Sequence, residues 1–189
     1  MPDMVLNEVI MPISQTLLPE FDEEMKSTRK LLECVPDGKF DYQPHPKSMT
    51  LGRLASHVAE LPSWGKTTLE VELLELGPEF KPHIAATRAE LLASFDKGVT
   101  EAREKIAAAT DADWQKMWTF KYGGKTVMSM PRVAVMRGVV MNHLIHHRAQ
   151  LGVFLRLNDV AIPGMYGPSA DEMKFWEAQP AQTASAQAS

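Results

Sequence analysis

Three histidines are the residues in this sequence best placed to do chemistry. His143 and His147 lie in the run Asn142–Arg148, and their i, i+4 spacing places both imidazoles on one side of a helix. One divalent ion can bind both rings, and Zn, Ni, Cu and Fe all bind imidazole well. His57 lies far away in the sequence, and helical bundles build metal sites from side chains on different helices. Three ligands leave one coordination position open, which is typical of catalytic sites.

The pattern of apolar residues predicts four helices that would position these histidines. Spacings of three and four residues indicate helices, and clusters of Pro and Gly mark their ends. The expected segments are a first helix over 17–35, a second over 50–76 with Thr50 as its N-cap, a third over 91–106, a short hairpin or irregular loop over 111–130, and a fourth helix over 131–157. The sequence therefore predicts an all-α four-helix bundle with a short insertion before the last helix.

The connections predict how these helices run. The link between the second and third helices is short, so those two should be antiparallel neighbours, while the linker before the fourth helix is long enough for a crossover. We expect residues 162–176 to pack on the bundle, so that one domain spans residues 1–177. Residues 178–189 are rich in Ala, Gln and Ser and are expected to form a disordered tail.

A helical wheel directs all three histidines toward the core. On the fourth helix the inward stripe is Met136, Val140, His143, His147, Leu151 and Phe154, and on the second it is His57, Leu61, Trp64 and Thr68. Histidines on an apolar stripe are often simply hydrogen-bonded core residues. Two of them one turn apart both need polar partners, because an unpaired buried polar group costs about 1–3 kcal/mol. A metal ion would satisfy both rings, but the spacing alone leaves both interpretations open.

Neighbouring residues have weaker roles in this pattern. His146 falls on the flank of the helix, about 100° from His147. Arg148 could lie at the surface or hold an acidic group, and Glu60 could either orient His57 as a hydrogen-bond acceptor or be an exposed carboxylate. No general base can be named, and His146 is the nearest candidate by sequence.

Composition excludes several classes of protein. The chain has 189 residues, enough for one domain with a substantial core, and its net charge of -4 gives no attraction to nucleic acid. Cys34 is the single cysteine, so no internal disulfide can form and a reducing compartment is indicated. No apolar run approaches the length of a membrane span, and the N-terminus lacks the features of a signal peptide. We therefore expect a cytoplasmic protein.

Three motifs stand out in the sequence, namely Pro44–Gly52 with Leu54–Ala59, Asn142–Leu151, and Tyr166–Glu172. With these motifs the chain resembles the DinB/YfiT-like family of metal-binding four-helix proteins. The resemblance covers nearly the whole chain, from Leu17–Asp22 to Tyr166–Glu172. It implies that His57, His143 and His147 are the metal ligands, that nickel or zinc is the ion, and that the protein forms a homodimer. Ala149 stands where the family often has Gly, which affects helix packing rather than the ligands.

The resemblance also implies a range of activities. Some related proteins are transferases or isomerases that depend on low-molecular-weight thiols such as bacillithiol or mycothiol, and many others have no assigned activity. The leading hypothesis is a metal-dependent enzyme that acts on a small molecule by thiol S-transfer or hydrolysis. The alternatives are a non-catalytic metal- or ligand-binding protein of a stress response, and a protein whose metal only stabilises the fold. A fourth protein ligand would favour that last alternative.

Overall fold

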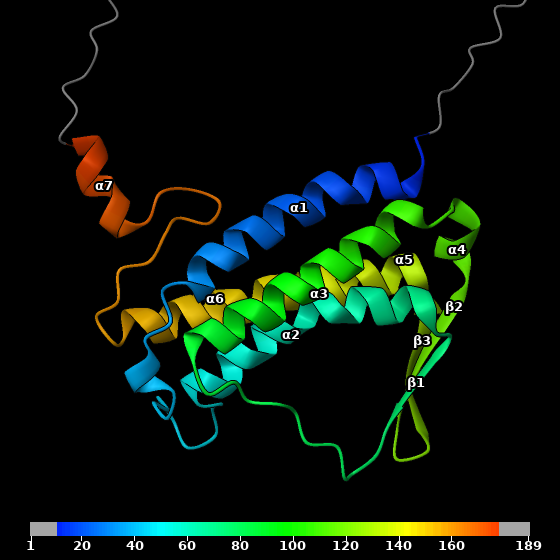
Figure 1. The fold of residues 1–189 in the computed structure, drawn as a ribbon, viewed down its shortest axis with the longest axis horizontal. Helices are drawn as coiled ribbons and strands as arrows, with labels where there is room; N and C mark the ends of the chain where they lie inside the picture. Colours follow the sequence, from blue (N-terminus) through cyan, green and yellow to red (C-terminus); the bar gives the residue numbers. More distant parts are fainter. Residues whose placement is uncertain (1–10, 178–189) are drawn as a thin grey trace, which may run out of the picture.

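The protein is mostly helical, with one small sheet. The computed structural model describes residues 11–177, and Figure 1 shows long helices packed side by side with the sheet at one end. The elements are α1 (Ile13–Leu32), a 3-10 turn (Asp37–Lys39), α2 (Leu51–Glu70), β1 (Leu73–Leu76), α3 (Arg88–Ala108), α4 (Asp111–Gln115), β2 (Met117–Tyr122), β3 (Lys125–Pro131), α5 (Arg132–Val135), a π-helical segment (Met136–Asn142), α6 (His143–Arg156) and α7 (Ala170–Glu177). The predicted tail, 178–189, lies outside the described residues.

Helices α2 and α3 run parallel, so the prediction that they are antiparallel is wrong. Lys66 pairs with Glu101 at 3.2 Å, and one turn further along both helices Glu70 pairs with Lys105 at 2.8 Å. The chain must therefore return along the whole length of α2 before α3 begins. Figure 1 shows this crossover between β1 and α3, and it is not the linker before the fourth helix that crosses over.

The second helix ends six residues earlier than predicted, because its expected last turn forms a strand instead. Thr50 caps the start as predicted, its hydroxyl accepting from the Arg53 backbone N–H at 3.2 Å. At the other end Val71 is extended, and the next residues form β1, which pairs in parallel with β2. β1 is an edge strand of this sheet, and it obtains backbone partners along the side that faces β2. The prediction of an all-α fold is therefore only partly correct, because the chain also forms a three-stranded sheet.

The region before the last helix contains the hairpin that the sequence allowed. β2 and β3 are antiparallel, and the two residues between them, Gly123 and Gly124, both have positive φ angles, of 54° and 76°. Two positive φ angles in a two-residue loop are what a tight hairpin turn requires, and glycine adopts them without steric cost. The sheet has the order β1-β2-β3.

The fourth long helix is composite. It begins after Pro131 and ends at Arg156, close to the predicted limits, and Asp159 follows with a positive φ of 58°. Seven residues in its first half, Met136–Asn142, follow a π-helical pattern instead of an α-helical one. A π turn holds more residues than an α turn, so side chains before and after it are not related by one helical wheel.

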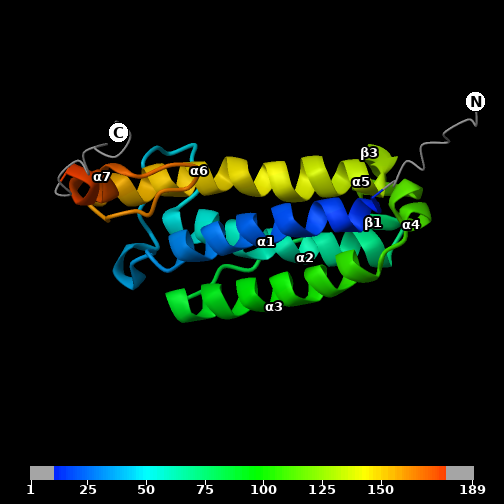
Figure 2. The ribbon, with the colours of Figure 1, turned by 90° about the horizontal axis from the view of Figure 1, so that it is seen from above.

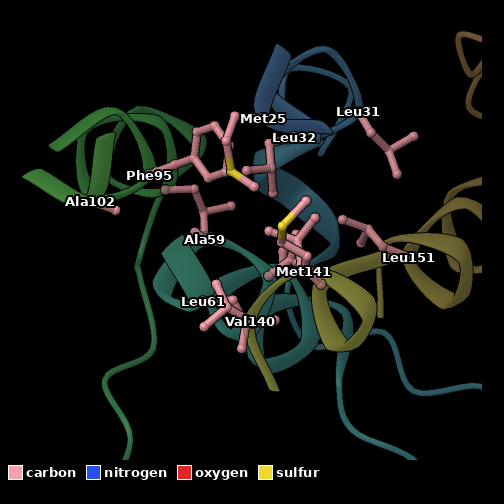
Figure 3. Packing of buried hydrophobic residues seen from close by; sticks show 14 of the residues in the cluster. Met25, Leu31, Leu32, Ala59, Leu61, Phe95, Ala102, Val140, Met141 and Leu151 are labelled. Carbon is pink, nitrogen blue, oxygen red and sulfur yellow. The ribbon is translucent and has the colours of Figure 1, made fainter. Parts of the chain in front are cut away.

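One apolar core joins the long helices. Figure 3 shows side chains from α1, α2, α3 and the composite helix meeting between them, among them Met25, Leu61, Phe95 and Val140. Helix α1 lies beside α3 and α6, and α2 lies beside the same two (Figure 2). From the C-terminal segment, Ile162 and Met165 also pack against this core, as expected for residues 162–176.

Arg148 is a buried cation in this core. Its exposed fraction is 2%, and its guanidinium contacts Glu24 at 2.7 Å, the Thr28 hydroxyl at 3.1 Å and the Tyr166 hydroxyl at 2.9 Å. Of the two positions that the sequence allowed, the structure has the one in which Arg148 holds an acidic group. A buried ion pair of this kind is costly to break, because removal of one partner leaves the other charge uncompensated.

Within residues 11–177, no helix has the length and apolar character that a membrane crossing needs.

Candidate metal centre

The structure brings the three predicted histidines together. His143 Nε2 lies 3.4 Å from His57 Nε2 and 2.9 Å from His147 Nε2. One nitrogen from each ring lies within 4.8 Å of both others, and this trio could hold a metal ion. His57 comes from the first half of α2, and the other two begin α6, which runs antiparallel beside it. Two neighbouring helices therefore bring together residues that are 86 positions apart.

Each ring is oriented from its far side by an oxygen. These contacts are His57 Nδ1 to Glu60 Oε1 at 2.6 Å, His147 Nδ1 to Gln150 Oε1 at 2.7 Å, and His143 Nδ1 to the Val139 backbone oxygen at 3.3 Å. A carboxylate, an amide oxygen and a backbone carbonyl only accept, so each Nδ1 must carry the proton. The three Nε2 atoms then present lone pairs toward one another. That arrangement is unfavourable without a positive ion among them, and it is typical of metal-bound histidines with outer hydrogen-bond partners.

The separations between the nitrogens suit one ion. A tetrahedral zinc ion binds imidazole nitrogens at about 2.0–2.1 Å, which places two such ligands about 3.3–3.4 Å apart. The observed 3.4 Å between His57 and His143 matches this separation, and the 2.9 Å between His143 and His147 is somewhat shorter. A small outward movement of one ring would open the closer pair. The residues therefore fit a divalent ion.

His143 and His147 stay neutral at physiological pH. Burial, together with the neighbouring His57, His143 and His146 rings, lowers the pKa of His147 to about 4, against a Gln150 hydrogen bond that raises it. Burial and the nearby His57 also hold the pKa of His143 below its usual value. A neutral imidazole has a free lone pair, so both rings can bind a metal ion without first losing a proton.

The π-helical segment decides which face of α6 carries the histidines. The sequence wheel placed His143 and His147 in the centre of the core stripe, but both are only half-buried, and the buried residues of α6 include Leu144, Arg148 and Leu151. The single wheel failed because it continued an α-helical rotation through residues 136–142, where the backbone is π-helical. His57, on the regular helix α2, is buried as predicted, with 8% of its surface exposed.

The sequence suggested one of the two side chains that orient the rings, Glu60, but not the other, Gln150. The sequence offered Glu60 two roles, and the structure has the one in which it accepts from His57. Gln150 was missed, although its position three residues after His147 is the spacing at which helical side chains meet. His146 is exposed and is not one of the three clustered histidines, although its ring centroid lies 4.8 Å from that of His147.

A cleft adjoins the site on the side of His147. Its volume is about 310 Å³, and it is lined by Lys47, Ser48, Met49, Leu54, His147, Gln150 and Phe154. This volume lies at the small end of the range for ligand pockets. The site therefore has room beside it for a small molecule.

Replacement of Glu60 should weaken metal binding without removing it. In Glu60→Gln the carboxylate that orients His57 is lost, and loss of such an outer partner typically lowers metal affinity about 10–100-fold. The dissociation constant would be measured by competition with a coloured chelator. Glu70→Gln is the matched control, because Glu70 ends the same helix and pairs with Lys105 away from the histidines. Equal affinities for the two variants would contradict the role given to Glu60.

The metal-free protein should lose stability as the pH falls from 7 toward 5. The pKa values of His143 and His147 are lower in the folded chain than in the unfolded one, where they lie near 6.5. The unfolded state therefore binds more protons below pH 6.5, and the stabilisation present above that pH is lost on the way down to about 4. The melting temperature should fall by several degrees, since about 1 kcal/mol shifts a domain of this size by about 2–4 °C. In the double variant His143→Gln, His147→Gln the fall should be smaller, and an equal fall would show that other groups cause it.

The sequence is similar to proteins of one known family. A model of the DinB family matches residues 2–183. The uncharacterized protein YrdA of Bacillus subtilis is 24% identical over 155 residues, which cover 82% of this chain and 89% of YrdA.

Three solved structures share the fold. A DinB-like protein from Bacillus cereus superposes with a TM-score of 0.64 at 24% identity, over 82% of this chain and 98% of its own. The DinB-like protein YjoA of Bacillus subtilis gives a TM-score of 0.61 at 15% identity, over 79% and 96% of the two chains. A putative DinB member from Exiguobacterium sibiricum gives 0.55 at 16%, over 79% and 95%. Because the family model matches nearly the whole chain, and the helices place its three histidines together, this protein belongs to the DinB family.

Proposed function

We propose that this protein binds one divalent metal ion through His57, His143 and His147, and that its four packed helical segments serve as the bundle that holds the ion. The observation that carries the proposal is the convergence of three Nε2 atoms whose rings are each fixed from behind by an acceptor. Imidazole suits nickel and zinc, which are the ions we propose.

The set of side chains around the centre favours a reactive ion over a purely structural one. Within the described residues, the cluster contains three histidines, and no Cys, Asp or Glu joins them as a fourth ligand. The Glu60 carboxylate contacts Nδ1 of His57, on the side of the ring opposite the Nε2 that faces the other histidines. Structural zinc sites normally have four protein ligands, whereas catalytic sites have three and leave a position for water or substrate.

We propose further that the protein is a metal-dependent enzyme acting on a small molecule, by thiol S-transfer or by hydrolysis. A divalent ion bound here would deprotonate a coordinated thiol or make a coordinated water more acidic, so that either becomes a nucleophile near neutral pH. The half-buried faces of His143 and His147 leave the centre accessible, and the cleft beside His147 would receive the molecule. His146, exposed next to His147, remains the nearest candidate for a general base. The family resemblance adds the proposal of a homodimer.

Metal content tests the ligand assignment. Protein purified without chelator should contain about one divalent ion per chain, because a three-histidine site suits one ion. The ion should be lost in the triple variant His57→Ala, His143→Ala, His147→Ala, and largely lost in His147→Ala alone. His146→Ala is the matched control, because its ring neighbours His147 without belonging to the cluster. The measurement is elemental analysis of each purified variant. A triple variant with its full metal content would overturn the assignment.

Cobalt substitution tests whether the ion has an open position. On addition of a thiol to the cobalt protein the visible spectrum should change, because sulfur enters the coordination shell. The chelated protein should stay helical and unfold cooperatively at a lower melting temperature, since its apolar core does not include the ion. Circular dichroism would follow the unfolding. A metal-free protein that is unfolded at room temperature, together with a cobalt spectrum that thiols do not alter, would instead indicate a structural metal.

A further inference from the structure

The cleft beside the histidines has two chemically different walls. Met49, Leu54 and Phe154 supply apolar surface, and Phe154 is held by an edge-to-face contact with Tyr42 at 6.3 Å between ring centroids. The remaining lining residues are polar, namely Lys47, Ser48, Gln150 and His147. A pocket with an apolar wall and a few placed polar groups is typical of small-molecule sites.

The polar wall is positive. Lys47 is the cation among the lining residues, and the described part of the cleft contains no carboxylate. None of the ion pairs within residues 11–177 involves the Lys47 ammonium, whereas Lys26, Lys66, Lys105 and Lys116 each pair with a carboxylate. An ammonium that borders a cavity without an anionic neighbour is suited to pair with an anion that enters.

The loop that carries Lys47 is fixed by its own hydrogen bonds. The Lys47 backbone N–H donates to His45 Nδ1 at 3.1 Å, and the Ser48 N–H donates to the His45 carbonyl at 2.8 Å. Gln43 joins the two ends of this loop, because its side-chain amide donates to the Ser48 carbonyl at 2.6 Å. The backbone of Lys47 is therefore held at the rim of the cleft before any ligand arrives, which reduces the entropy lost on binding.

Gln150 connects this wall to the candidate metal centre. Its side-chain oxygen accepts from His147 Nδ1, which leaves the amide N–H groups of the same side chain as donors in the cleft. The positive end of α2 lies directly after the Lys47 loop and adds to the potential there. Its first N–H groups are already used by Tyr42, Phe40 and Thr50, so direct contacts must come from side chains.

From these features we infer that the cleft binds the carboxylate of a small substrate, with Lys47 as its ion-pair partner and the apolar wall covering its carbon chain. The opposite end of such a molecule would reach the ion held by the histidines. This inference rests on the proposed metal function and deepens it, because it names the substrate class as carboxylate-bearing small molecules. Lys47 is thereby a specificity-determining residue.

The test compares two thiols of equal carbon chain length, mercaptopropionate and mercaptopropanol, on the cobalt-loaded full-length protein. The affinity of each would be read from the change in the visible spectrum. The ion attracts any anion, so neither affinity is diagnostic by itself. The diagnostic quantity is the affinity for mercaptopropionate divided by the affinity for mercaptopropanol, and how this ratio changes between variants. An exposed ion pair typically contributes a factor of about two to five. The ratio should therefore fall by about that factor in Lys47→Ala, and further in Lys47→Glu.

Lys39→Ala is the matched control. Lys39 is also exposed and lies in the same connection before α2, but it does not line the cleft, so its removal should leave the ratio unchanged. In the wild type the ratio should decrease with added salt, since salt screens exposed charges. Metal content and circular dichroism of each variant would verify that the site and the fold are retained.

The outcomes separate this inference from the proposal beneath it. If neither thiol alters the spectrum of the wild type, the open-position proposal fails and the inference fails with it. If both thiols bind, and the ratio is the same in the wild type, Lys47→Ala and Lys47→Glu, the inference alone is wrong, because the carboxylate is then recognised elsewhere.

Discussion

The repulsion among three imidazole lone pairs is the interaction on which the candidate centre depends. Three rings that direct Nε2 lone pairs at one another, with separations of 3.4 Å for His57–His143 and 2.9 Å for His143–His147, would separate if they were free to turn. They are not free, because the protons on Nδ1 are committed to oxygens of Glu60, Gln150 and Val139. The chain therefore uses hydrogen bonds on the outside of the cluster to hold an arrangement that only a cation on the inside would relieve. We therefore expect the outer oxygens to affect the affinity for a metal ion, although none of them would touch the ion.

The same arrangement requires that α6 neither rotates nor slides against α2. Arg148 follows His147 directly and points the other way, into the core, where it pairs with Glu24 of α1 and donates to the Tyr166 hydroxyl of the C-terminal segment. A charge buried to 2% exposure fixes the rotation of its helix more strictly than an apolar side chain, because any turn would separate it from its partners. His147 thus faces the other two histidines, and its neighbour Arg148 faces the core. The two requirements together set the rotation of α6, while the π-helical segment before it absorbs the difference in register with α5.

How much of this could be predicted from the sequence differs between local and distant features. The Thr50 cap, the Gly123-Gly124 turn, the start of the last helix after Pro131 and the three histidines all follow from residue types at short spacing, and the structure has each of them. The strand β1 was missed because Leu73–Leu76 reads equally well as a last helical turn, and its partner strand lies more than forty residues away. The parallel course of α2 and α3 was missed for the same reason. Residues 71–76 were assigned to the second helix, which made the link to α3 look short, but they lie outside that helix and include β1. The π-helical segment has no signal in residue spacing, so the burial of His143 and His147 was overestimated.

The start of α2 links the candidate centre to the cleft. Gly52, in its first turn, lies against Phe40 so closely that a Cβ there would come within 2.7 Å of the ring, which fixes the connection to the start of the helix. From that point the chain places Lys47 at the rim five residues before, and His57 at the centre five residues after. The backbone positions of both residues are therefore fixed by the packed first turn of α2. Because an ion at the histidines and a carboxylate at Lys47 would be bound by the two ends of this short stretch, the distance between them is set by backbone that is already ordered. A substrate that spans both positions would then be bound by two residues whose backbones are held at a fixed separation by the packing of Gly52 on Phe40, which would reduce the entropy lost on binding.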